Sequence, residues 1–182
     1  MSNDSKYCYP GTDILKNLLD TKNQQSLTDY ENTVSFARNY ELFRKPIKGD
    51  FSLTHLSQIH YYLFQDVYPF AGKVRTVNIS KDGFPFARTQ HIHSEAEVTY
   101  RALKKDDFLK GLALDSFTSK IAEHMAEINM LHPFREGNGR SIREYIRLLA
   151  LNAGYDMDWS VVDKNLVLQA SIRSKVDSTQ LT

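Results

Sequence analysis

Apolar residues recur at spacings of three and four along most of the chain, which is the periodicity of amphipathic helices. The first such segment runs roughly from Gln25 to Lys45 and ends before Pro46. Its expected core face consists of Leu27, Tyr30, Val34, Ala37 and Phe43. A shorter helix is expected after Ser52, a typical N-cap residue. Its apolar stripe is formed by Leu53, Leu56, Ile59 and Leu63.

Further helices are expected in the second half of the chain. Ser94 is a suitable N-cap for the segment SEAEVTYRALKK, and Asp115 or Ser116 for the long segment DSFTSKIAEHMAEINML. Pro133 disfavours the α conformation at His132, so the long helix is expected to end there. The next helix is predicted by the spacing of Ile142, Tyr145, Ile146 and Leu149.

The last part of the chain contains one helix-end signal and one helix-start signal. Gly154 is a natural residue to follow a helix C-terminus, because glycine adopts positive φ without steric cost. Ser160 to Asp163 resembles a capping box. The segment that follows reaches Thr182 without a stop signal, which is compatible with a chain that continues. The final helix would carry Leu166, Val167 and Ala170.

One segment has the pattern of a β-hairpin. The runs KVRTVNI and FPFART flank Ser80-Lys81-Asp82-Gly83, and Asp-Gly is a strong signal for a hairpin turn. Pro85 lacks a backbone donor, so the second run is expected at an edge. We therefore predict a mainly α-helical fold, a single domain over residues 1–182 with one exposed two-stranded flap.

The composition is that of an ordinary folded domain. Hydrophobic residues make up 41% and charged residues 25%, with 23 Lys and Arg against 22 Asp and Glu. This charge balance gives no support to nucleic-acid or anionic-membrane binding. The single cysteine, Cys8, cannot form a disulfide within the chain, which suits a reducing compartment. The N-terminus lacks a signal-peptide layout, and no apolar run is long enough to span a bilayer.

The stretch HPFREGNGR concentrates the candidate chemistry of the chain. Gly137 and Gly139 let the backbone approach an anion closely, at the point where the next helix begins and its N–H groups lack partners. Asn138 adds an amide donor, and Arg140 and Arg143 add positive charge on the first helical turn. Two arginines beside a glycine-rich turn favour a ligand with more than one phosphate.

Glu136 and His132 complete a site for chemistry on phosphate. A carboxylate beside the expected anion site, the turn around Gly137 and Gly139, would repel phosphate unless a cation lay between them. Glu136 is therefore a candidate Mg²⁺ ligand. His132 is close to this turn in sequence, and a histidine is largely neutral near pH 7, so it can accept a proton. Together these groups suit attack of a hydroxyl on phosphorus.

Each of these residues also has an ordinary structural explanation. Glycine-rich turns between helices, histidines before proline and surface arginines are common without function. Their coincidence in one short loop with a helix on each side favours the functional interpretation. Phe134 is the exception, because it is expected to anchor the loop in the core.

The run HPFREGNGRSIR, His132 to Arg143, resembles the signature of the Fic family, HPFx(D/E)GNGRxxR, and fills every specified position. The stretch IHYYLFQDVYPFAGKVR, Ile59 to Arg75, is similar to a second landmark of the family, a helix that leads into an aromatic-Ala-Gly turn. Phe70 stands where tryptophan is common, at an expected core position. The resemblance implies a Fic fold, a helical bundle with a helix-loop-helix active site.

The resemblance also implies transfer of AMP from ATP to a Ser, Thr or Tyr hydroxyl of a target protein, with release of pyrophosphate. By this resemblance His132 would deprotonate the hydroxyl, and Glu136 would hold Mg²⁺. The backbone around Asn138 would form an anion hole for the nucleotide. The nucleotide-binding residues would be Gly137, Asn138, Gly139, Arg140 and Arg143, with the two arginines on the outer phosphates.

Two further implications concern the target and the reaction. The hairpin from Val74 to Thr89 would clamp a target peptide by strand addition. Related Doc-type proteins, which phosphorylate their target, carry lysine at the position of Gly139, so glycine favours nucleotidyl transfer here. The flap residues expected to meet the target are Ile79, Ser80, Lys81, Asp82, Gly83 and Phe84.

A hypothesis about regulation follows from a motif that the 182 residues lack. Many Fic proteins carry an inhibitory helix, (S/T)xxxE(G/N), whose glutamate pairs with the second signature arginine. Glu31-Asn32 matches the last two positions, but Leu27 stands where Ser or Thr is required. We therefore hypothesise inhibition by a small antitoxin-like partner, with a flanking segment as the alternative source.

Two other interpretations stay open. The chain could be a degenerate Fic domain that binds nucleotide or a partner without turnover, although such a module has no need of a base. A metal-dependent hydrolase could use His124, Glu127 and His132, because positions 124 and 127 can share a helix face. We expect a bacterial cytoplasmic protein, and translocation into a host cell is compatible with the resemblance.

Overall fold

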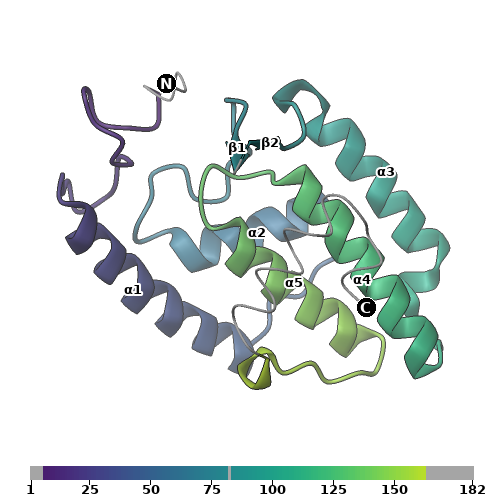
Figure 1. The fold of residues 1–182 in the computed structure, drawn as a ribbon. Helices are drawn as coiled ribbons and strands as arrows, with labels where there is room; N and C mark the ends of the chain where they lie inside the picture. Colours follow the sequence, from purple (N-terminus) through teal and green to yellow (C-terminus); the bar gives the residue numbers. More distant parts are fainter. Residues whose placement is uncertain (1–5, 82, 163–182) are drawn as a thin grey trace.

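The computed structural model describes residues 6–81 and 83–162 of the chain (Figure 1). Within these ranges helices dominate, which confirms the expected mainly helical fold with one hairpin. The helices are α1 (Gln24–Arg44), α2 (Leu53–Phe64), α3 (Ile92–Lys105), α4 (Leu114–Leu131) and α5 (Asn138–Asn152). The hairpin consists of β1 (Ser80–Lys81) and β2 (Phe84–Pro85). Short 3₁₀ turns are Thr89–His91, Asp107–Leu109 and Trp159–Val161.

Helix α2 lies at the centre of the molecule and packs against α1, α3 and α5, while α4 packs against α3 and α5 (Figure 1). Ser52 caps α2 as predicted, since its hydroxyl accepts from the His55 N–H at 3.4 Å. Burial of one Leu, Ile or Phe side chain stabilises the fold by roughly 1.5–3 kcal/mol relative to leaving it exposed. The buried apolar residues of α2 are Leu56, Ile59, Leu63 and Phe64.

The prediction for α1 is right about its extent and partly wrong about its inner face. Asn23 caps the helix by accepting from the Ser26 N–H at 2.9 Å. Ala37 and Phe43, both expected in the core, are exposed, and Leu42 is buried instead. The error has a physical cause, because the inner face of α1 also carries Glu31 and Ser35, which interact with Arg140 of α5. A search for apolar spacing alone passes over such residues.

The ends of the later helices follow the predictions more closely than their starts. The long helix α4 ends at Leu131 as expected, and Gly154 has φ +92° just after α5. Helix α3 begins at Ile92, before Ser94, because a 3₁₀ turn leads directly into it. Helix α4 begins at Leu114, with Ala113 rather than Asp115 or Ser116 as N-cap. Residues 163–182, including the expected helix through Leu166, Val167 and Ala170, lie outside the described residues.

The hairpin is shorter than predicted. Only Ser80 pairs with Pro85 and Lys81 with Phe84, in antiparallel register. Below these pairs the Phe86 N–H still donates to the Ile79 carbonyl at 3.2 Å. Beyond that bond the guanidinium group of Arg75 bridges the two arms by donating to the carbonyls of Val77 at 2.9 Å and Ala87 at 2.5 Å. A buried side chain therefore takes the place of ladder hydrogen bonds at the flap base. Asp82 lies outside the described residues.

The core is continuous around α2 and reaches the N-terminal segment. Phe70, where tryptophan is common, is buried as expected and contacts the rings of Tyr7 and Tyr68. Cys8 is also buried. None of the helices in the described ranges has the length and apolar character needed to cross a membrane.

Candidate functional site

The signature run His132 to Arg143 covers the loop between α4 and α5 and the first turns of α5 (Figure 1). Asn138 donates from Nδ2 to the carbonyl of Phe134 at 2.8 Å and accepts at Oδ1 from the Phe134 N–H at 2.9 Å. The Phe134 side chain is fully buried, as expected of a core anchor. These contacts close the loop into a compact turn before α5 begins.

The position of Asn138 corrects the expectation that its side-chain amide donates to an anion. The side chain is buried, and both of its polar atoms bond the Phe134 backbone. Its role in this structure is to shape the loop. The backbone N–H of Asn138 lies in the first turn of α5, where N–H groups have no partner within the helix.

His132 follows the last residue of α4 in a left-handed conformation, with φ 44° and ψ 61°. Its Nδ1 lies 3.2 Å from the carbonyl oxygen of Asn129. Since a carbonyl only accepts, the neutral ring carries its proton on Nδ1 and its lone pair on Nε2. The Phe86 ring stacks on the imidazole, with centroids 3.7 Å apart and planes 12° apart. The ring is therefore held in one tautomer and one orientation.

The flap is attached to this loop at its base. Arg75, which is 2% exposed, donates from Nε to the His132 carbonyl at 2.8 Å. The Ala87 N–H donates to the Met130 carbonyl at 3.1 Å. Because Phe86 stacks on His132, the chain leaving β2 passes directly over the histidine. Of the expected flap residues, Ser80, Lys81 and Gly83 are exposed.

Two glycines of the signature lie where the loop enters α5, and they differ in how strictly the geometry requires them. Gly137 has φ +77°, and a Cβ at this position would lie 2.4 Å from the Phe64 ring. At Gly139 a Cβ would lie 3.3 Å from a guanidinium nitrogen of Arg143. A larger residue at position 139 would therefore push against Arg143. Position 137 therefore requires glycine, and glycine at position 139 leaves the Arg143 guanidinium in place.

Glu136 is half-buried and lies next to Gly137. Its Oε1 accepts from the Gly137 N–H at 2.9 Å. No group of three or more potential metal-ligating side chains occurs in the described parts of the chain. A single carboxylate suits Mg²⁺, which is usually bound by one or two carboxylates together with substrate phosphates rather than by a protein cage.

Arg140, in the first turn of α5, is held by side chains of α1 and α2. Arg140 forms an ion pair with Glu31 and donates to the Ser35 hydroxyl at 2.9 Å, both on α1. Its guanidinium also lies 4.7 Å from the centroid of the Phe64 ring. Burial, and secondarily Arg143, lowers the pKa of Arg140 to about 10, and the adjacent Glu31 favours the charged form. Arg140 is therefore protonated at neutral pH.

Sequence reasoning missed the residues that hold Arg140. Glu31 is buried and also accepts from the Tyr68 hydroxyl, so it ties α1 to both α5 and the turn after α2. Glu31 is 109 positions from Arg140 in the chain. The available signal was Glu31-Asn32, which resembled a fragment of an inhibitory motif, but its true partner is the first signature arginine rather than the second.

The model of the Fic/DOC family matches residues 50–150 of this chain. The chain is 36% identical over 167 residues to the probable protein adenylyltransferase Fic of Escherichia coli K12, an alignment that covers 91% of this chain and 82% of that relative. The chain belongs to the Fic/DOC family. It is also 42% identical over 180 residues to the protein adenylyltransferase VbhT of Bartonella schoenbuchensis. This alignment covers 99% of the chain and 37% of VbhT, so the chain spans little more than a third of that relative.

A solved Fic structure has the same architecture. The BepC protein of Bartonella tribocorum, with bound AMPPNP, is 26% identical and superposes with a TM-score of 0.88 over 97% of this chain and 92% of that one. These comparisons confirm the predicted family and the Fic fold. They also show that the chain is similar in sequence to protein adenylyltransferases. AMPPNP is an ATP analogue, which agrees with ATP as the expected nucleotide.

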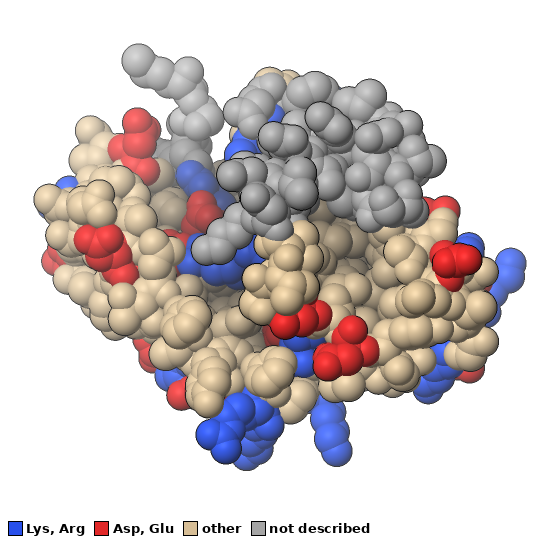
Figure 2. All heavy atoms as spheres, turned by 60° about the horizontal axis from the view of Figure 1, so that its bottom comes forward, with Lys and Arg blue, Asp and Glu red and all other residues tan. Residues whose placement is uncertain are grey.

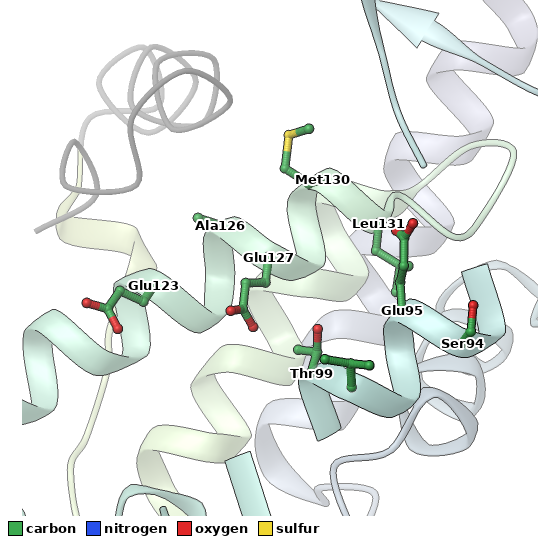
Figure 3. Close-up of a pocket in the computed structure, with 9 residues that line it drawn as sticks. Ser94, Glu95, Thr99, Glu123, Ala126, Glu127, Met130 and Leu131 are labelled. Carbon is green, nitrogen blue, oxygen red and sulfur yellow. The ribbon is translucent and has the colours of Figure 1, made fainter. Parts of the chain in front are cut away.

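The hydrolase interpretation is not supported, because its three residues do not converge. His124 is buried, and its Nε2 lies 3.0 Å from the hydroxyl of Tyr145, which itself donates to the Phe51 carbonyl. Glu127 instead lines a hollow of about 640 Å³ between α3 and α4 (Figure 3), and its lining includes neither His124 nor His132. Burial lowers the pKa of His124 to about 4, as expected of a neutral core histidine.

The charged side chains on the face drawn in Figure 2 are mixed in sign. There, Lys and Arg are interspersed with Asp and Glu. No broad basic patch of the kind that nucleic acid requires covers the described part of that face.

Proposed function

We propose that this Fic protein is a protein adenylyltransferase that transfers AMP from ATP to a Ser, Thr or Tyr hydroxyl of a target protein. The observation that carries the proposal is His132, held within an intact signature loop in the tautomer that directs a lone pair to Nε2. A general base must present such a lone pair to the nucleophile.

In the proposed reaction the target hydroxyl gives its proton to Nε2 of His132. Its oxygen attacks the α-phosphorus of ATP, and the bond from that phosphorus to the oxygen bridging the α- and β-phosphates breaks. Pyrophosphate leaves. The N–H groups at the start of α5 and the guanidinium groups of Arg140 and Arg143 would stabilise the charge on the phosphates. Gly139 leaves Arg143 in place for this role.

Glu136 is the residue that would hold Mg²⁺, together with phosphate oxygens. When bound, the ion would neutralise phosphate charge beside this carboxylate. Without a cation, Glu136 and the phosphates would repel each other.

The flap would present the target. Ser80 and Lys81 form an exposed strand to which an extended peptide can add. Since Phe86 stacks on His132, the flap is fixed relative to His132, the proposed general base. A peptide added to the flap would therefore have a defined position relative to Nε2. The flap residues Ile79, Ser80, Lys81, Asp82, Gly83 and Phe84 are proposed to contact the target.

The proposal is tested with radiolabelled ATP and Mg²⁺ in a bacterial lysate. Label on the α-phosphate is expected to appear on a target protein, and label on the γ-phosphate is not. His132→Ala should abolish the labelled band, whereas His93→Ala, a matched change at an exposed histidine, should not. Label transferred from the γ-position, or retained by His132→Ala, would contradict the mechanism. ATP binding with no transfer in any lysate would favour an idle binding module.

A small antitoxin-type partner is proposed to inhibit the enzyme. Two features support it: the 182 residues contain no intact inhibitory motif, and α1 exposes Phe36, Tyr40 and Phe43. Purification from the native host at native levels should recover a stoichiometric small protein whose removal raises labelling. Recovery of the wild-type chain alone and active would count against it. The same chemistry suits a toxin in the bacterial cytoplasm and an effector such as BepC, which is described as VirB-translocated.

A further inference from the structure

His60, on α2, has no part in the reaction proposed above, yet it contacts the signature loop. The ring is fully buried. It stacks on the Phe134 ring with centroids 3.9 Å apart and planes 28° apart. His60 therefore packs directly against the residue that anchors the loop.

Both nitrogens of His60 bond backbone groups. The Gly72 N–H lies 2.8 Å from Nδ1, and Nε2 lies 2.9 Å from the Glu136 carbonyl oxygen. An amide N–H only donates and a carbonyl only accepts, so Nδ1 holds the lone pair and Nε2 holds the proton. Neither the other tautomer nor the imidazolium can satisfy both partners. Burial also lowers the pKa of His60 to about 4, which keeps the ring neutral.

The two partners of His60 lie on the two sides of the site. Glu136 and Gly137 form the side proposed for the metal ion and the anion, where a Cβ on Gly137 would collide with the Phe64 ring. Gly72 begins the segment that leads to Arg75, whose N–H donates to the Pro133 carbonyl at 2.8 Å and whose Nε donates to the His132 carbonyl at 2.8 Å. The His60 ring thus connects the backbone of Glu136, beside the proposed anion site, to the segment that bonds His132.

We infer that His60 is a positioning residue, whose neutral Nε2–H tautomer holds the Glu136 backbone so that the Glu136 carboxylate and the Gly137 N–H keep their place relative to His132. His60 touches neither the nucleotide nor the target in this role. The inference rests on the proposed adenylyl transfer. Buried groups that orient a metal ligand are typically worth roughly 10–100-fold in metal affinity or activity.

The test compares His60→Phe with His60→Gln. Phenylalanine keeps the ring stack and loses both hydrogen bonds, while the glutamine amide can still donate to the Glu136 carbonyl. His60→Phe should lower kcat for AMP transfer roughly 10–100-fold and raise the Mg²⁺ concentration needed for half-maximal rate. The KM for the target should stay unchanged. His60→Gln should recover most of the loss.

His124→Phe is the matched control, because His124 is likewise buried and neutral but bonds Tyr145 instead of the loop. It should lose thermal stability without a change in Mg²⁺ dependence. If His60→Phe behaves in the same way as His124→Phe, or keeps the wild-type kcat, His60 has only a packing role. If His60→Phe does not fold, the tautomer of His60 in the wild-type protein carries the test.

Two readouts are independent of turnover. In wild-type protein, ¹⁵N spectra of the imidazole should show His60 as the Nε2–H tautomer at neutral pH. Calorimetric titration with ATP should show a weaker dependence of binding on Mg²⁺ in His60→Phe than in wild type. The Nδ1–H tautomer or equal Mg²⁺ dependence would overturn the inference. Should the wild type transfer no AMP, the proposed function fails while these two measurements still decide the role of His60.

Discussion

The signature loop and the flap meet at His132, but they are built in opposite ways. The loop is held from several directions: Asn138 bonds both backbone groups of Phe134, His60 bonds the Glu136 carbonyl, and Gly137 lies against Phe64. The flap has two-residue strands in which Ser80, Lys81 and Pro85 are exposed, whereas Arg75 and Phe86 at its base are buried. Chemistry at phosphorus needs donors fixed in advance, whereas an added peptide strand needs an open edge.

The largest effect on stability is expected from a substitution of Arg75, which joins the loop to the flap. This buried side chain donates to the carbonyls of Leu131, His132, Val77 and Ala87. Arg75→Met should lower the free energy of unfolding by roughly 3–5 kcal/mol, because several buried carbonyls lose their donor. Urea denaturation measures the change. Arg88→Met, at an exposed position of the same segment, is the control, and equal losses in both variants would refute the role of Arg75 as the junction.

Substitution of Asn138, which shapes the loop, should lower the free energy of unfolding somewhat less than Arg75→Met. Asn138→Ala removes both hydrogen bonds to Phe134 and should destabilise the fold by roughly 2–4 kcal/mol, since a buried donor and acceptor are left unsatisfied. Asn152→Ala, at an exposed position at the end of the same helix, should change the free energy by less than about 0.5 kcal/mol. A tolerant Asn138→Ala variant would mean that the loop is not held as described.

Acid should destabilise the helical core that supports the loop, through buried histidines that the flap lacks. His60 and His124 have pKa values of about 4 in the folded protein, below the value of about 6.5 expected when unfolded. The unfolded state then binds more protons between these values, so stability is full above about pH 6.5 and falls as the pH drops toward about 4. The flap segment Val74–Thr89 contains no histidine. Between pH 7 and 4.5, His124→Phe should lose less stability than wild type, by about 2 kcal/mol. Parallel pH profiles would contradict this.

The smallest effect on stability is expected in the flap. Lys81 is exposed in β1. Lys81→Ala should change the free energy of unfolding by less than about 0.5 kcal/mol, as is usual for surface positions. The sharper measurement is the labelling of target protein at constant ATP concentration, which should fall if the flap binds the target. A variant that loses stability but labels normally would reverse the proposed division of roles.

Local structure and the candidate chemistry were readable from short stretches. Pro133 after His132 predicted the end of α4, Gly154 predicted the end of α5, and the run from His132 to Arg143 carried the family signature. These features depend on backbone conformation and neighbouring residues, which a linear pattern records directly. The hydrophobic periodicity likewise placed the helices to within a few residues.

The connections that hold the site were decided only by the tertiary structure. Glu31 meets Arg140 across 109 positions, and His60 meets Glu136 across 76. A polar residue on a helix resembles a solvent-facing one in sequence, because its burial depends on which helix packs over it. Arg75 shortened the hairpin for the same reason, since its guanidinium replaces ladder bonds that the strand pattern had predicted. Sequence supplied the reacting groups, and packing determined which buried side chains hold them.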